Sequence, residues 1–196
     1  NEHHPNDHHP NDHHPTRNEL YHLPRISPMK SLLIGKVVLV GSLAIFALLT
    51  GINNVTDYHA NFEFVRHVLS MDSIFPNSAI RGRAILNPAI WNLAYWAIIA
   101  CEFLAGLLLA IGCFQLARNI GHPRRFVRAK GWAISGCVLG FLLWFFGFIV
   151  IGGEWFAMWQ SQSWNGINSA FRFVMVILGV LIFVAMPEPT SGEQEE

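Results

Sequence analysis

Ionisable side chains are rare inside the apolar segments of this 196-residue chain, and those that occur there are the first candidates for chemistry. Glu102 has apolar residues on both sides for several helical turns. A carboxylic acid at membrane depth must be protonated, paired or turned toward a cavity. Lys36 and Arg172 come within combined side-chain reach if their segments cross a bilayer as tilted helices. We therefore expect a buried charge cluster of Glu102, Lys36 and Arg172, which would either stabilise the fold or relay protons or ions.

Histidines form two further candidate sites. His59, Glu63 and His67 follow one another at intervals of four, so a helix would present two imidazoles and a carboxylate to one metal ion, although such exposed histidines are more often simply solvated. Residues 3–15 read HHPNDHHPNDHHP, where proline excludes a continuous helix and no apolar side chain supports a core. This repeat is interpreted as a solvated tail or, alternatively, as a transition-metal site formed by His3, His4, His8, His9, His13 and His14.

The apolar segments contain no recognisable nucleophile with its base, phosphate-binding loop or pair of haem ligands. The sequence therefore predicts no catalytic residues and a protein that is not an enzyme. Three cysteines lie within apolar runs and are interpreted as small packing residues: Cys101, Cys113 and Cys137. We expect no cofactor apart from a possible transition metal on the histidine-rich tail, and bound lipid.

Composition indicates the fold class. The chain is 52% hydrophobic and only 13% charged, which is too apolar for a soluble domain of this length. Its net charge of zero gives no reason to expect a nucleic-acid partner. Four apolar segments are long enough to cross a bilayer, at about residues 31–52, 87–117, 131–153 and 167–186. They predict an all-α, four-transmembrane-helix bundle over residues 27–187, between a histidine-rich tail (1–26) and an acidic tail (188–196).

The basic residues predict the orientation of this bundle. The connection after the second span contains five cations, and the connection after the third contains none, so the former should be cytoplasmic. The five are Arg118, Arg124, Arg125, Arg128 and Lys130. With four crossings, both termini are then cytoplasmic, and residues 53–87 lie on the outer side. We expect a multi-pass membrane protein whose residues 53–87 face the periplasm or the exterior.

Residues 53–76 are amphipathic. Apolar side chains recur at intervals of three and four at Val55, Tyr58, Phe62, Val65 and Leu69. The opposite face carries polar side chains at Asp57, His59, Asn61, Glu63 and His67. This pattern predicts a periplasmic amphipathic helix between the first and second spans, lying in the membrane interface and capping the bundle or meeting a partner.

Glycines on the third span predict where helices approach closely. Gly136 and Gly140 form a G-x-x-x-G motif, and Gly147 follows two turns later on the same side. The absence of side chains along this stripe would let a neighbouring helix pack against the backbone. The motif does not specify whether that neighbour belongs to this chain.

A longer signature supports a family resemblance. Residues 53–72, NNVTDYHANFEFVRHVLSMD, are followed by Phe75-Pro76, by Arg83-Ala84-Ile85 and by a proline-started helix containing Glu102. Over about residues 30–185 the chain resembles an uncharacterised bacterial family of small four-helix integral membrane proteins. The resemblance implies the inner membrane and this topology, without implying an activity.

These observations favour a non-catalytic accessory subunit that stabilises a larger inner-membrane complex, energy-transducing or dehydrogenase, by helix packing. Its partners would be other integral membrane subunits and lipids. One alternative is a small ion- or proton-coupled transporter or relay centred on Glu102, although no inverted repeat or broken helix accompanies it. Another is a metal-handling membrane protein that uses the histidine-rich tail.

Overall fold

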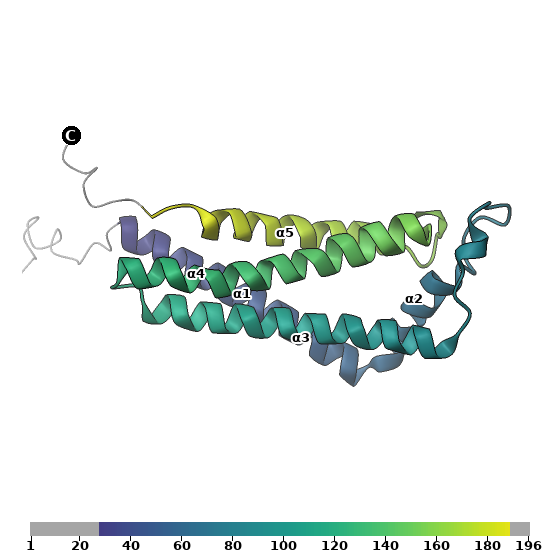
Figure 1. Cartoon of the computed structure of the whole chain (residues 1–196), viewed down its shortest axis with the longest axis horizontal. Helices are drawn as coiled ribbons and strands as arrows, with labels where there is room; N and C mark the ends of the chain where they lie inside the picture. The colour runs from purple at the N-terminus through teal and green to yellow at the C-terminus, as the bar shows by residue number, and fades with distance from the viewer. Residues whose placement is uncertain (1–27, 189–196) are drawn as a thin grey trace, which may run out of the picture.

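The computed structural model describes residues 28–188 (Figure 1). All regular structure in this range is helical. Four helical spans are long and apolar enough to cross a membrane: α1 (Pro28–Thr56), α3 (Pro88–Arg118), α4 (Pro123–Phe141) continuing into η3 (Leu142–Trp155), and α5 (Ile167–Ala185). The prediction of an all-α bundle with four membrane-length helices is confirmed.

Capping residues and prolines set several of the helix ends. Asn87 caps α3, because its side-chain oxygen accepts a hydrogen bond from the backbone nitrogen of Ala89 at 2.9 Å, and Pro88 occupies the first helical turn. α5 ends at Ala185, two residues before Pro187, which cannot continue a helix. Two helix ends differ clearly from expectation: α1 continues to Thr56 instead of ending near residue 52, and α4 begins at Pro123 instead of near residue 131.

The third span changes its winding within the bundle. Residues 142–155 form a π-helix, η3, and the bond that closes it runs from the backbone nitrogen of Phe156 to the carbonyl oxygen of Ile151, at 3.0 Å. π-helical turns are rare and occur frequently at functional sites. Because their hydrogen bonds span five residues, the side chains that share a face differ from those of an α-helix.

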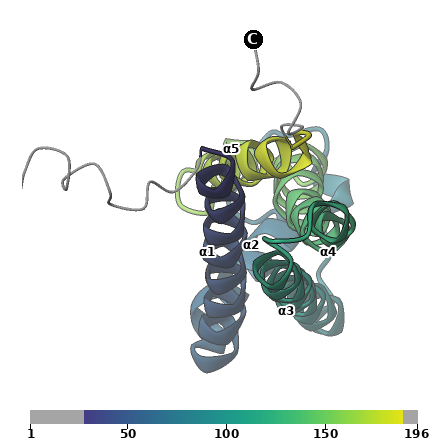
Figure 2. The same ribbon diagram turned by 90° about the vertical axis from the view of Figure 1, so that its left-hand side faces the viewer.

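The spans pack in a ring, in which α1 lies against α3, α3 against α4, and α5 against both the third span and α1 (Figure 2). Glycines allow the closest approaches. A Cβ at Gly112 would lie 2.6 Å from the backbone nitrogen of Ala133, and one at Gly136 would lie 2.9 Å from that of Leu109. The α3–α4 contact is therefore made backbone to backbone.

The predicted glycine stripe is only partly correct. Gly136 packs against α3, and a Cβ at Gly140 would lie 3.4 Å from Ile177 of α5. A Cβ at Gly147 would approach only Leu143 of the same helix, at 4.0 Å. Gly147 lies in η3, where the wider spacing of the π-helix takes it out of the stripe, and it lines an apolar cavity instead.

A separate helix, α2 (Tyr58–Ser70), follows α1 and packs against α3. We call this end of the bundle the α2 end, and the opposite end, which holds Pro28 and Glu188, the termini end (Figure 1). The apolar face of α2 is buried through Val65, Val68 and Leu69. The predicted extent was too long, because the chain turns at Asp57 and Val55 stays on α1, 46% exposed.

Two short turns complete the α2 end, η2 (Arg81–Arg83) and η4 (Met158–Gln160). η2 lies in the connection after α2, and η4 lies in the connection after η3. The hydroxyl of Ser73 donates to that of Ser161 at 2.8 Å, and Arg83 donates to the carbonyl oxygen of Trp155 at 3.2 Å. Polar contacts thus hold the two long connections together.

Candidate functional site

Glu102 is the centre of a buried polar network at the α2 end. Glu102 lies on α3 and is only 2% exposed. The amide nitrogen of Asn54, near the end of α1, donates to both carboxyl oxygens, at 3.0 and 2.8 Å. The side-chain oxygen of Asn54 in turn accepts from the amide of Asn61 on α2, at 2.7 Å. One hydrogen-bonded chain therefore connects three helices.

Two tyrosines support this network. The hydroxyl of Tyr95 donates to the backbone oxygen of Asn54 at 3.2 Å, and its ring meets that of Tyr58 edge-on with centroids 4.7 Å apart. Tyr58 donates to the side-chain oxygen of Asn92 at 2.8 Å. Partial burial raises the pKa of Tyr58 above its ordinary value.

Glu102, Asn54 and Asn61 line a cavity of about 420 Å³ between α1, α2, α3, η3 and α5. Its inner part is formed by the buried Glu102 and Asn54, and its rim by the exposed Asn61, Ser163 and Asn165. Aromatic rings make up much of the wall: Phe64, Tyr95, Trp144, Phe148, Trp164 and Phe173. None of the described residues that line this cavity is Lys, Arg or His.

The expected cluster of Glu102, Lys36 and Arg172 does not form. Lys36 is fully buried, but its ammonium group lies at the termini end and donates to a carboxyl oxygen of Glu188 at 2.9 Å. Arg172 is exposed on α5. Sequence position gave the approximate depth of each residue but not the rotation of its helix. The partner of Glu102 is Asn54, one of two adjacent asparagines, and not the cation that the sequence predicted.

The termini end contains a second buried cluster, which sequence reasoning did not find. Lys36 on α1 and Lys130 on α4 both contact one oxygen of Glu188, at 2.9 and 2.6 Å, and both donate to the backbone oxygen of Met186, at 2.8 and 2.7 Å. The sequence assigned Lys130 to a cytoplasmic basic run and Glu188 to the acidic tail. The apolar residues that share a helical face with Lys130 were the available signal: Phe126, Ala133 and Cys137.

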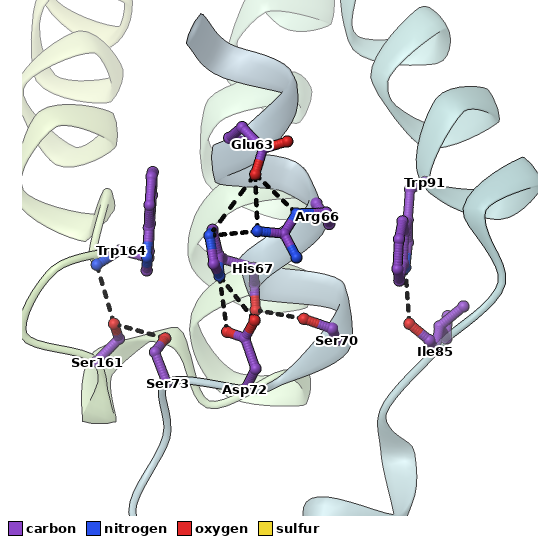
Figure 3. A network of polar contacts seen from close by, with 10 residues as sticks. All are labelled: Glu63, Arg66, His67, Ser70, Asp72, Ser73, Ile85, Trp91, Ser161 and Trp164. Carbon is purple, nitrogen blue, oxygen red and sulfur yellow. Dashed lines mark hydrogen bonds and ion pairs between the residues drawn. The ribbon is translucent and has the colours of Figure 1, made fainter. Parts of the chain in front are cut away.

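The polar face of α2 forms its own network (Figure 3). Arg66 is paired with Glu63 at 2.7 Å, and the Nδ1 atom of His67 lies 2.7 Å from a carboxyl oxygen of Asp72. The ring of His67 stacks on Trp164 with centroids 4.2 Å apart. This stack joins α2 to the connection before α5. Of the other residues predicted on this face, Asn61 belongs to the Glu102 network and Asp57 lies exposed at the turn before α2.

Of the three residues weighed as an alternative metal site on α2, only Glu63 and His67 approach each other, with a carboxyl oxygen and a ring nitrogen 3.8 Å apart. His59 lies against the rings of Tyr58 and Phe62, whereas His67 turns to Asp72 and Trp164. Within residues 28–188, no three His, Cys, Asp or Glu side chains come together in a way that could hold a metal ion. The histidines of the pentad repeat lie outside the described residues.

Replacing Asn54 by alanine should lower the free energy of unfolding by about 1–3 kcal/mol, because Glu102 would stay buried without its hydrogen-bond donor. Unfolding by SDS, followed by circular dichroism in mixed micelles, measures this change. The matched control is Asn53→Ala, which alters an exposed neighbour on the same helix. Equal stability of the two variants would contradict the structural role of Asn54.

Comparison with known proteins places the chain in a family without adding an activity. No curated protein matches it, and no solved structure matches it. A family model described as "Predicted small integral membrane protein (DUF2165)" matches residues 32–187, a range that covers α1 except its first turn, the other three spans, α2 and the whole Glu102 network. The chain therefore belongs to this family of small integral membrane proteins.

Proposed function

We propose that the protein is a non-catalytic accessory subunit of a larger complex in the bacterial inner membrane, which it stabilises by helix packing. An energy-transducing or dehydrogenase assembly is the class that we expect. In this proposal both termini are cytoplasmic and the α2 end faces the periplasm, as the basic residues at the end of α3 and the start of α4 indicate. Its partners are integral membrane subunits and lipids, and not nucleic acid.

The observation that carries the proposal is the apolar layer between the two polar clusters. On α3, the buried residues between Glu102 and the termini end are Ala105, Gly106, Leu109, Gly112 and Leu116. On α1, those between Lys36 and Asn54 are Val40, Leu43, Ala44, Ala47 and Gly51. None of these has an ionisable side chain. This layer supports a packing role over a proton or ion relay, which needs polar groups or water throughout its path.

The buried polar side chains also support a structural role. Lys36, Asn54, Glu102, Lys130 and Ser161 are the buried polar or charged residues of the described chain. Each of them hydrogen-bonds to another part of the same chain. Glu102 contacts an amide and the two lysines contact a carboxylate at the other end, so an acid and a base do not face a shared reaction space.

Photo-crosslinking in native membranes tests the proposal. A photoreactive amino acid would be placed at one lipid-exposed position on each span: Ile45, Leu107, Val138 and Val176. We expect one or two of these positions to give a discrete adduct that mass spectrometry identifies as a membrane subunit present in stoichiometric amount after purification. The matched control is the buried neighbour Ile177, which should crosslink only within the chain.

The outcome that would overturn the proposal is equally specific. If all four exposed positions crosslink only to lipid, and the protein purifies without a stoichiometric partner, it does not act as a subunit of a complex.

A further inference from the structure

We infer that the cavity at the α2 end binds an organic ammonium ion, with Glu102 as its counter-charge and the surrounding aromatic rings as its walls. This site is independent of the accessory role, because it is formed entirely within one chain.

Charge is the first reason for this inference. Glu102 is buried, its hydrogen-bond partner is a neutral amide, and no described lining residue of the cavity carries a cation. The single amide nitrogen of Asn54 leaves acceptor capacity on both carboxyl oxygens. A carboxylate that faces a cavity without a counter-charge is complementary to a cationic ligand.

The walls distinguish an organic cation from a metal ion. Ca²⁺ and Mg²⁺ take six or more oxygen ligands in a compact shell. This cavity offers one carboxylate, a few amides and hydroxyls, and six aromatic residues within about 420 Å³, whereas a water molecule occupies about 30 Å³ of liquid. Aromatic faces attract ammonium groups, and most strongly where water is excluded. Size and lining therefore both favour a ligand with alkyl substituents.

A second cavity adds an apolar compartment. A space of about 260 Å³ between α2, α3 and η3 is lined almost entirely by apolar side chains. It shares Phe64, Val65, Ile98 and Phe148 with the polar cavity. An ammonium ion on Glu102 could therefore extend an alkyl group toward this compartment. Free amines and ammonium-bearing lipid headgroups have this chemistry in common.

Calorimetric titration of the purified protein tests the inference. Maltoside micelles are suitable because they carry neither charge nor ammonium groups. The probes are choline, ethanolamine, sodium ion and 3,3-dimethyl-1-butanol, which is the neutral analogue of choline. We expect at least one ammonium probe to bind and to change the fluorescence of Trp144 and Trp164, while sodium ion and the neutral alcohol do not. Glu102→Gln should weaken that binding by about tenfold or more, since the charged partner is lost.

Two matched pairs of variants make the test specific. Glu154→Gln removes an exposed carboxylate on η3 outside the cavity and should leave binding unchanged. If Glu102→Gln fails to fold, Ser169→Phe narrows the cavity from an exposed position on α5, and Asn168→Phe is its exposed neighbour outside the lining. Of this second pair, Ser169→Phe should abolish binding and Asn168→Phe should leave it unchanged.

A competition experiment with a lipid identifies the source of the ligand. If phosphatidylethanolamine added to the micelles competes with the soluble probe, the ligand is a lipid headgroup; if it does not, the ligand is a free amine. Absence of binding to the unmodified protein overturns the inference, as does equal binding of the neutral alcohol, binding of sodium ion alone, or unchanged binding in both Glu102→Gln and Ser169→Phe.

Discussion

Replacing Glu188 by alanine should lower the free energy of unfolding by about 3–5 kcal/mol, the range typical for breaking a buried ion pair. Glu188 is the shared carboxylate of Lys36 and Lys130, whose side chains are 0% and 7% exposed. Without it, two buried ammonium groups would repel each other and share only the backbone oxygen of Met186. Unfolding in SDS, compared with Glu154→Ala as the exposed control, measures the difference.

A double variant tests the explanation. Adding Lys36→Met to Glu188→Ala removes the more deeply buried of the two cations, so part of the lost stability should return. Neighbouring charges that share a partner are not additive, and the double-mutant cycle measures their coupling. A double variant as unstable as the sum of the two single variants would contradict the shared-carboxylate arrangement.

Replacing Gly112 by leucine should disrupt the contact between α3 and α4 and cost about 3 kcal/mol or more of stability. A Cβ at Gly112 would lie 2.6 and 2.8 Å from the backbone nitrogen and Cα of Ala133. Backbone atoms cannot rotate away as side chains can, so the helices themselves would have to separate. Thermal denaturation in detergent, followed by circular dichroism, should show a lower midpoint or no folded protein.

The control for this prediction is Gly179→Leu on α5, where an added Cβ meets nothing within 4 Å. Both variants remove a helix glycine and add the same apolar side chain. Since glycine disfavours helices, Gly179→Leu should be neutral or slightly stabilising. Equal losses at the two positions would mean that helix packing at Gly112 is not the cause.

The four spans could be predicted because they depend on local properties of the sequence. Apolar length identified the spans, and the predicted start of the second span near residue 87 agrees with Asn87 and Pro88 at the start of α3. The interval of three and four also identified the buried Val65 and Leu69 of α2. Each of these signals lies within a single helix.

The polar clusters could not be predicted because they depend on how the helices are rotated and tilted against one another. Glu102 was identified as buried, yet its partner is Asn54 and not a cation. Lys36 was identified as unusual, yet its partner lies beyond the end of α5. The π-helical winding of η3 left no sequence signal that we recognised, and it moved Gly147 out of the packing stripe.

The shared carboxylate at the termini end has a consequence for biosynthesis. Lys36 and Glu188 are separated by 152 positions, so the first helix leaves the ribosome long before its counter-charge has been translated. Until then, the lysine of α1 can satisfy its charge only by reaching toward water or lipid headgroups. The ring of four spans can therefore be completed only after the end of α5 has been translated. A nascent chain arrested before Glu188 should be cleaved by proteases that the finished protein resists.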